Sequence, residues 1–235
     1  MFYKMPSNFS LEKAERAQRL LAPRVKVYDD FEKPIKFVGG ADVAWRGDLA
    51  VGCITVHSYP SLQLLEKCTA RVESSFPYIS TFLSFREIRP LMAALSKLSI
   101  KPTILFVNGQ GIAHPRRFGL ASHLGVVAKI PTIGVAQRVL YGKPKNPLNE
   151  VGYVELIDDA SGREEIIGYL YRRNKRFNPI CISPGHRVSL ETALRLTISC
   201  IKEGVKLPIP LHSAHVEARK EAIRIGSLGQ NVKRQ

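Results

Sequence analysis

Two acidic residues lie in segments that are otherwise largely apolar. Asp42 stands within residues 37–45, FVGGADVAW, where an unpaired carboxylate would be costly to bury. Glu87 follows the run 82–85, which faces the protein core if this segment is helical. Each acid can be compensated by a hydrogen bond or an arginine, or both can bind a hard cation such as Mg²⁺. Carboxylates that hold Mg²⁺ from separate elements serve phosphodiester cleavage, so the pair favours that chemistry.

A third polar group follows a short apolar strand. Residues 104–107, ILFV, predict a buried strand that ends at Asn108, and the loop after it contains Gly111 and His114. From Phe118 the apolar spacing becomes helical. Ligands bind at such strand ends in open α/β sheets, although the same pattern is found in ordinary connections whose basic residues are solvated. The two acids favour a shared metal site.

Composition narrows the partner class. Lys and Arg number 35 against 20 Asp and Glu, a formal net charge of +15, so the long-range field attracts polyanions and favours nucleic acid. No uncharged apolar stretch reaches the roughly 18 residues of a spanning helix, and the N-terminus does not resemble a secretory signal. We therefore expect a cytoplasmic protein without membrane association. Four widely spaced cysteines without a CxxC pair predict buried free thiols rather than a zinc site.

The spacing of apolar residues predicts one domain over 1–235 with a mixed sheet. Ser10 caps a first helix that ends at Pro23, and Ser189 caps a late helix that reaches about residue 203. The last ten residues or so are expected to be frayed. The predicted strands are 35–44, 49–58, 62–75, 103–107, 132–136 and 179–182, with a hairpin of 151–157 and 165–171; further helices are predicted at 81–98 and 118–129.

Three stretches carry motifs that are specific in combination: GGADV (39–43), PYIS followed by FLSFRE (77–87), and the strand-loop segment 104–123 with HPRRFGLASH at its end. Weaker matches lie at 183–187 and 207–215. Over nearly the whole chain they resemble the endonuclease V family of deoxyinosine-directed nucleases. The resemblance implies an α/β, ribonuclease H-like fold with a mixed five-stranded sheet flanked by helices and an added hairpin.

The resemblance assigns metal ligands and departs from the family at one of them. Asp42 and Glu87 match two metal-binding acids, but the third acid falls on Asn108, whose amide oxygen carries no formal charge. His215 matches a late histidine of the active centre, although a solvated helix histidine is also consistent. The implied reaction is Mg²⁺-dependent nicking of the second phosphodiester 3′ to deoxyinosine, weakened here by Asn108, with Mn²⁺ able to substitute. The products carry 3′-hydroxyl and 5′-phosphate ends.

The resemblance also implies a wedge and a base pocket. Pro77, Tyr78, Ile79 and Ser80 match a rigid turn whose tyrosine fills the space left by an extruded base. At Gln137 the family usually has a phosphate-contacting lysine, for which Arg138 or Lys143 are possible replacements. The remaining residues expected to contact the base or phosphates, or to steady the loop, are Gly111, His114, Arg116, Arg117 and His123.

Several alternatives remain open at this point. Inosine-containing RNA is a close variant of the deoxyinosine-containing DNA substrate. A module that binds inosine with little or no cleavage is favoured by Asn108 and Gln137. Another ribonuclease H-like nuclease, such as a junction resolvase, is a weaker alternative. A monomer is expected because no unpaired apolar helix face stands out.

Overall fold

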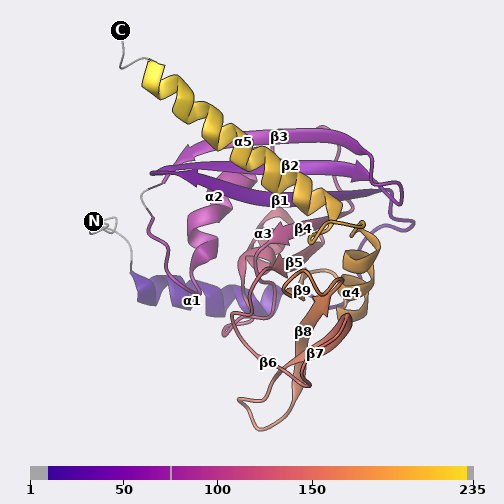
Figure 1. The fold of residues 1–235 in the computed structure, drawn as a ribbon. Helices are drawn as coiled ribbons and strands as arrows, with labels where there is room; N and C mark the ends of the chain where they lie inside the picture. Colours follow the sequence, from indigo (N-terminus) through magenta and orange to yellow (C-terminus); the bar gives the residue numbers. More distant parts are fainter. Residues whose placement is uncertain (1–9, 75, 232–235) are drawn as a thin grey trace.

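The computed structural model describes residues 10–74 and 76–231, and its elements form three layers with one mixed sheet between two groups of helices (Figure 1). The sheet order is β3-β2-β1-β4-β5-β9-β8-β7-β6, in which only the β1–β4 and β4–β5 pairs are parallel. The strands are β1 (Phe37–Arg46), β2 (Leu49–Ser58), β3 (Leu64–Glu73), β4 (Ile104–Asn108), β5 (Thr132–Ala136), β6 (Lys143–Pro144), β7 (Gly152–Asp158), β8 (Glu165–Arg172) and β9 (Ile180–His186).

The predicted five-stranded mixed sheet is confirmed as β3-β2-β1-β4-β5, but it does not end there. Strand β9 pairs with β5 on one side and with β8 on the other, so the hairpin β7–β8 continues the same sheet and the described residues form nine strands. The sequence analysis ended the last strand at Ile182 because Ser183-Pro184-Gly185 is a turn-like tripeptide. Instead, a register shift at Thr132/Ile133 lets β5 pair with this segment up to His186.

Five α-helices cover the two faces of the sheet within the described ranges: α1 (Leu11–Leu21), α2 (Leu83–Leu95), α3 (Leu120–Ala128), α4 (Leu190–Ser199) and α5 (Ile209–Asn231), with a 3-10 turn at Ala22–Arg24. Ser10 and Ser189 cap α1 and α4 as predicted, each through a side chain that accepts a backbone N–H. Helices α2 and α4 are shorter than predicted, because α2 starts at Leu83 and α4 ends at Ser199.

Strand β4 is buried on both faces, which explains its continuous apolar sequence. Ile104 and Phe106 contribute to the core on the side of α4 and α5, whereas Leu105 and Val107 contribute to the core beneath α2 and α3. Successive side chains alternate between faces, so Asn108 points to the same side as Phe106. The strand therefore delivers its terminal amide towards the face that α5 covers.

Helix α5 runs through Asn231, so it includes part of the tail that is expected to fray, and residues 232–235 lie outside the described residues. Its alanines at 214, 218 and 222 are buried, and the first two pack with Cys53 of β2. A Cβ at Gly40 would lie 2.1 Å from the carbonyl oxygen of Pro210, so only glycine permits this close approach. Small residues on both surfaces thus seat the helix on the sheet.

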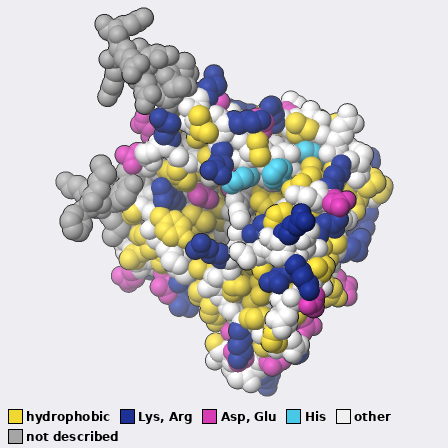
Figure 2. Space-filling view, viewed as in Figure 1, with side chains coloured by type: hydrophobic (Ala, Val, Ile, Leu, Met, Phe, Trp, Pro, Cys, Tyr) yellow, Lys and Arg dark blue, Asp and Glu magenta, His cyan; other side chains and the backbone are white. Residues whose placement is uncertain are grey.

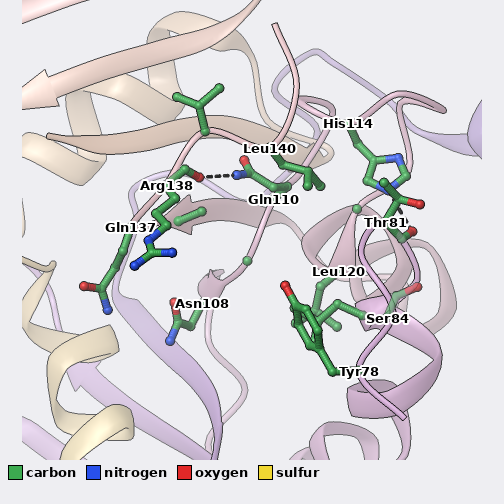
Figure 3. Close-up of a pocket in the computed structure, with 15 residues that line it drawn as sticks. Tyr78, Thr81, Ser84, Asn108, Gln110, His114, Leu120, Gln137, Arg138 and Leu140 are labelled. Carbon is green, nitrogen blue, oxygen red and sulfur yellow. Dashed lines mark hydrogen bonds between the residues drawn. The ribbon is translucent and has the colours of Figure 1, made fainter. Parts of the chain in front are cut away.

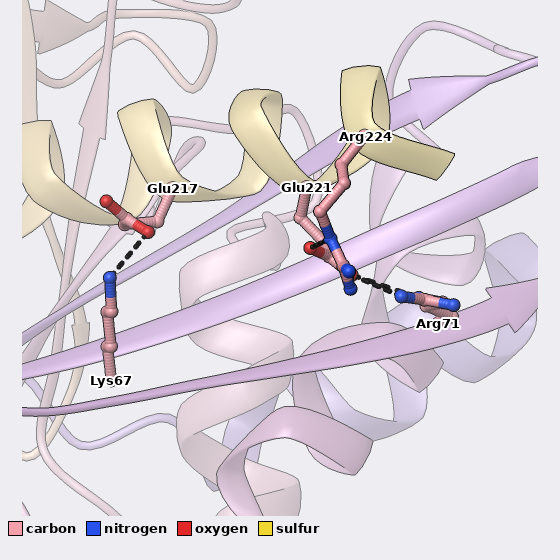
Figure 4. Close-up of polar contacts among 5 residues, drawn as sticks. All are labelled: Lys67, Arg71, Glu217, Glu221 and Arg224. Carbon is pink, nitrogen blue, oxygen red and sulfur yellow. Dashed lines mark hydrogen bonds and ion pairs between the residues drawn. The ribbon is translucent and has the colours of Figure 1, made fainter. Parts of the chain in front are cut away.

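A ladder of ion pairs fixes the other side of α5 to the edge strand β3 (Figure 4). Lys67 Nζ lies 2.8 Å from Glu217, and Arg71 lies 2.5 Å from Glu221, which also accepts from Arg224. The hydrogen bonds from these two arginines lower the pKa of Glu221 to about 2. Because the partners come from an edge strand and a late helix, the ladder ties together segments about 150 residues apart.

All four cysteines are free thiols, as predicted. Burial raises the pKa of Cys53, Cys181 and Cys200 to about 12, which keeps these thiols protonated and unreactive. Within residues 10–74 and 76–231, no helix combines the length and the apolar character that crossing a membrane would require.

Candidate metal and nucleic-acid site

The parallel pairing of β1 with β4 brings Asp42 and Asn108 together. Ala41 is in register with Val107, so the next residue of each strand lies side by side at the same strand end. Asn108 donates a hydrogen bond from Nδ2 to Asp42 Oδ1 at 2.8 Å. Residues that are 66 positions apart in the sequence therefore lie side by side at one end of the sheet.

His215, in the first turns of α5, completes this group. Its Nδ1 lies 2.7 Å from Asp42 Oδ2, and since a carboxylate only accepts, Nδ1 carries the proton of this hydrogen bond. Asp42 is 6% exposed, and both of its oxygens have partners. The buried charge that the sequence left unexplained is therefore compensated by an amide and an imidazole.

Glu87 approaches from the opposite face of the sheet, on α2. Trp45 of β1 donates from Nε1 to Glu87 Oε1 at 3.2 Å, and the guanidinium of Arg86 stacks 3.8 Å from the centre of the Trp45 ring. Burial, reinforced by the Asp42 charge and opposed by the Trp45 hydrogen bond, raises the pKa of Glu87 to about 8. Without a cation, the Glu87 carboxyl therefore holds a proton at neutral pH.

The donor set of Asp42, Glu87 and Asn108 fits a hard divalent cation. All three supply oxygen, which Mg²⁺ prefers, and a cation would offset the burial and the Asp42 charge that raise the pKa of Glu87. The described residues contain no group of three His, Cys, Asp or Glu side chains arranged to hold a metal. Asn108 is outside that search because its donor is an amide oxygen.

A pocket of about 510 Å³ opens beside Asn108 (Figure 3). Tyr78 and Asn108 lie on opposite sides of it, and Gln137 and Arg138 form another part of its wall. Tyr78 is 67% exposed, which suits a side chain that contacts a ligand rather than the core. The lining residues are Tyr78, Thr81, Leu83, Ser84, Asn108, Gly109, Gln110, His114, Gly119, Leu120, Ala136, Gln137, Arg138, Val139 and Leu140.

The segment that carries Tyr78 is anchored at Thr81, which has a left-handed backbone with φ of 67°. Its carbonyl accepts from Gln18 Nε2 at 2.8 Å and from His114 Nε2 at 2.9 Å. Arg116 donates to the Thr81 hydroxyl at 2.6 Å and to the Gln18 side chain at 2.5 Å. Hydrogen bonds from two other parts of the chain thus hold a strained residue directly after the predicted wedge.

His114 is a neutral positioning group within this anchor. Burial lowers its pKa to about 4, so the ring is uncharged at neutral pH. Nε2 then donates to the Thr81 carbonyl, and Nδ1 accepts the backbone N–H of Arg116 at 3.1 Å. Both ring nitrogens are satisfied, which fixes the tautomer and the orientation of the loop.

Three residues expected at the pocket do not line it. Arg116 is occupied by the Thr81 anchor. His123 is buried against Phe85 and Phe118, and burial lowers its pKa to about 4. The N–H of Gly111 donates to Ser183 Oγ at 2.9 Å, because this glycine packs against the backbone of β9. Arg116 thus has the contacts of a residue that steadies the loop, which is one of the predicted alternatives.

The sequence analysis missed other residues that line the pocket, including Ser84, Gln110 and Leu140. Gln110 donates from Nε2 to the Arg138 carbonyl, which joins the loop after β4 to the segment after β5. Its position two residues after a predicted strand end was a usable signal. Arg117, like Arg116, has the contacts of a residue that steadies the loop: it pairs with Asp158 and Glu165 of the hairpin at 2.6 Å each.

A cation does lie beside Gln137, but it is not one of those proposed from the sequence. Lys206 Nζ donates to Gln137 Oε1 at 3.3 Å, and burial lowers the pKa of this lysine. Lys143 instead pairs with Asp159 on the hairpin. Arg138 lines the pocket, so it remains close to any ligand bound there.

The mixed sheet brings Asp42 and Asn108 together at adjacent strand ends beside an open pocket, and α2 carries Glu87 on the other face of the sheet. The family model described as Endonuclease V matches residues 19–216, and the chain belongs to this family of endonucleases. An Endonuclease V from Protochlamydia amoebophila is 44% identical over 217 residues, which cover 89% of each chain.

Solved structures of the same family share the fold. The Endonuclease V of Streptomyces avermitilis superposes with a TM-score of 0.83 at 32% identity, covering 96% of this chain and all of its own. The Endonuclease V of Ciona intestinalis, in complex with DNA containing an inosine followed by a ribo-adenosine, gives a TM-score of 0.82 at 31% identity, covering 92% of this chain and 98% of its own.

Proposed function

We propose that this protein recognises deoxyinosine in DNA and nicks the second phosphodiester bond on its 3′ side, as a repair endonuclease that uses Mg²⁺. The observation that carries the proposal is the junction of two sites at Asn108. This residue lines the 510 Å³ pocket and donates to Asp42, so a base held in the pocket lies next to the candidate metal ligands. The Ciona relative bound to inosine-containing DNA supports the same substrate.

Recognition depends on removing the base from the stack. Tyr78 is exposed at the pocket mouth and fills the space that the extruded base leaves, because its ring can stack on the neighbouring bases. The Thr81 anchor holds this tyrosine in place before DNA binds, which reduces the ordering cost of binding. A volume of about 510 Å³ accommodates a purine base with part of its sugar.

Asp42, Glu87 and Asn108 would hold Mg²⁺ through oxygen atoms, with Mn²⁺ as a substitute. When bound, the cation supplies charge stabilisation for the phosphoryl oxygens and lowers the pKa of water. His215 orients Asp42 through Nδ1, and its free Nε2 is available to accept a proton from the attacking water. The Glu87 carboxyl has a pKa of about 8, so it releases its proton when the cation binds.

A second candidate function, binding inosine with little cleavage, is favoured by Asn108. Asn108 donates a hydrogen bond from its amide Nδ2 to Asp42. An aspartate at position 108 would direct a second carboxylate oxygen to this place instead. The site then has at most two formal negative charges for the cation. This second candidate function has the same ligand, inosine, as the proposed endonuclease. The two differ only in the rate of phosphodiester cleavage.

The deciding experiment compares the unaltered chain with Asn108→Asp on an inosine duplex and a matched adenosine duplex, in Mg²⁺ and in Mn²⁺. We expect both proteins to bind the inosine duplex more tightly than the adenosine duplex. We expect the variant to nick about 10²-fold faster, which is the scale of the effect of one electrostatic group on the chemical step. Equal and negligible nicking by both proteins, with inosine binding intact, would favour the binding module. A strand with ribonucleotides around the inosine tests the RNA preference in the same assay.

A further inference from the structure

A groove of about 360 Å³ has Asp42 in its wall, and Asp42 accepts a hydrogen bond from Asn108, which lines the base pocket, so the two cavities adjoin through this pair. Residues 42–46 at the end of β1 form one wall, and His215, Arg219 and Ile223 of α5 form the other. These three α5 residues are spaced by four, so they share one stripe of the helix. The groove therefore begins at the Asp42–His215 contact and continues away from the base pocket.

The two arginines of the groove have no ionic partner within the described part of the chain. Arg46 and Arg219 are both exposed, and neither makes a hydrogen bond or an ion pair with a described residue. The neighbouring stripe of α5 behaves differently, because Glu217 and Glu221 neutralise Lys67 and Arg71 of β3 (Figure 4). On one side of the helix the charges are neutralised by ion pairs with β3. On the other side the positive charge of Arg219 has no ionic partner among the described residues.

The surface around the groove has the same character. Figure 2 shows histidine side chains near the centre of the face that α5 crosses, with Lys and Arg side chains on several sides of them. The groove itself combines those cations with apolar surface from Val43, Ala44 and Ile223. Arginines beside apolar walls suit a chain that alternates phosphates with sugars, and they do not suit a free inorganic anion alone.

We propose that this groove binds the backbone of the nicked strand on the 3′ side of the cut, with Arg219 and Arg46 contacting its phosphates. The inference rests on the proposed function, which places the inosine base in the 510 Å³ pocket. A strand that leaves that pocket reaches Asn108, then Asp42, and then the groove. Since the cut lies 3′ to inosine, the segment beyond Asp42 is the 3′ segment, which carries the new 5′-phosphate.

Fluorescence anisotropy on metal-free protein in EDTA tests the proposal without cleavage. Three inosine duplexes serve as probes: one that extends on both sides of the lesion, one that ends at the cleavage position, and one truncated on the 5′ side instead. The variants are Arg219→Ala, Arg219→Glu and Arg46→Ala, all at exposed positions. Arg224→Ala is the matched control, because Arg224 lies on the same helix and pairs with Glu221.

We expect Arg219→Ala to weaken binding of the two probes that retain the 3′ segment by about five-fold. The dependence of log K on log salt concentration should also become less steep, by the amount that about one phosphate contact contributes. Arg219→Glu should weaken them further. The probe that ends at the cleavage position should bind each variant as it binds the unaltered chain, and Arg224→Ala should bind all three normally. Unchanged binding by the Arg219 variants, or an equal loss on the probe without the 3′ segment, would overturn the proposal.

The same titrations distinguish failure of the groove from failure of the proposed function. Each probe is also made with adenosine in place of inosine. If the unaltered chain prefers inosine and the Arg219 variants match it on every probe, only the groove assignment is wrong. If the unaltered chain shows no preference for inosine, the proposed function fails, and the groove assignment fails with it.

Discussion

The base pocket and the metal site meet at Asn108 but are built in opposite ways. Around the pocket, the polar groups of the Thr81 anchor are paired with one another, and they include a histidine that stays uncharged at neutral pH. At the metal site, Asp42 is hydrogen-bonded to an amide and an imidazole, and the Glu87 carboxyl, which approaches from α2, holds a proton. The polar groups of the first region are satisfied within the protein, whereas the carboxylates of the second would be stabilised by a bound cation.

This difference separates recognition from catalysis. A preorganised pocket contributes to affinity whether or not a cation is bound, because its hydrogen bonds form within the protein. The metal site depends on a charge balance that Asn108 has altered by one unit relative to a carboxylate. Substitutions on the metal side should therefore change rates and pH dependence, and substitutions on the pocket side should change discrimination and stability.

The largest effect is expected for Glu87→Gln, measured in the Asn108→Asp background so that nicking is easily quantified. Loss of a buried metal carboxylate should lower nicking by about 10²-fold or more, while inosine binding in EDTA remains. Inosine binding that falls in parallel with nicking would place Glu87 in recognition instead. Glu73→Gln, at an exposed position on β3, is the control for the loss of an acid.

Glu87→Gln also has a predicted signature in stability. A carboxyl whose pKa rises from 4.5 to about 8 on folding binds its proton more tightly in the native state, so stability falls as pH rises between these values. In EDTA, the unaltered chain should lose on the order of 3–5 kcal/mol more than Glu87→Gln between pH 4.5 and pH 8. Urea unfolding at several pH values measures this, and parallel pH profiles would contradict it.

Tyr78→Ala tests the recognition side. Removing the ring should reduce the preference for inosine over adenosine about ten-fold, the scale of one base-aromatic stacking contact, with little change in salt-sensitive non-specific binding. Tyr153→Ala is the control, because Tyr153 is 56% exposed on β7 of the hairpin. Equal losses on both duplexes would show that Tyr78 contributes only general affinity.

Lys206→Ala should have a smaller effect, since one cation at the edge of the site is lost. We expect about five-fold weaker binding of the inosine duplex, with a salt slope reduced by about one contact. Gln137→Lys in the same chain should restore binding, because the two side chains are in contact and either position can carry the charge. Lys202→Ala is the control from the same loop, and a double variant no better than Lys206→Ala would refute the shared role.

Gln18→Ala should have the smallest effect on ligand binding and act mainly on stability. The side chain is 1% exposed and bridges Thr81 and Arg116, so its removal leaves buried polar groups unpaired at a cost of about 1–3 kcal/mol. The melting temperature should fall by several degrees, with inosine preference reduced about two-fold. Gln63→Ala, at an exposed position, should leave both unchanged, and a stable Gln18→Ala protein would show that the anchor contributes little.

Local pattern was sufficient for most of the sheet and for the chemical character of the site. Periodicity and turn residues located strands β1 to β5 and the hairpin, because each is bounded by glycine, proline or polar clusters. Helix α5 was missed, since prolines at its start and many charges resemble a loop. Its position depends on alanines packed against β1 and β2 and on ion pairs with β3, which no local pattern contains.

By itself, the sequence determined that two carboxylates had to be compensated in apolar surroundings, and that an amide follows the buried strand at 104–107. Only the tertiary structure decided the partners. Asp42 contacts residues 66 and 173 positions away, through strand register in one case and helix packing in the other. Burial and long-range pairing also separated Arg116 and His123, which support the fold, from Arg219, which faces an open groove. The pKa and the hydrogen bonds of a charged side chain depend on the residues around it, and the packing of distant segments determines which residues those are.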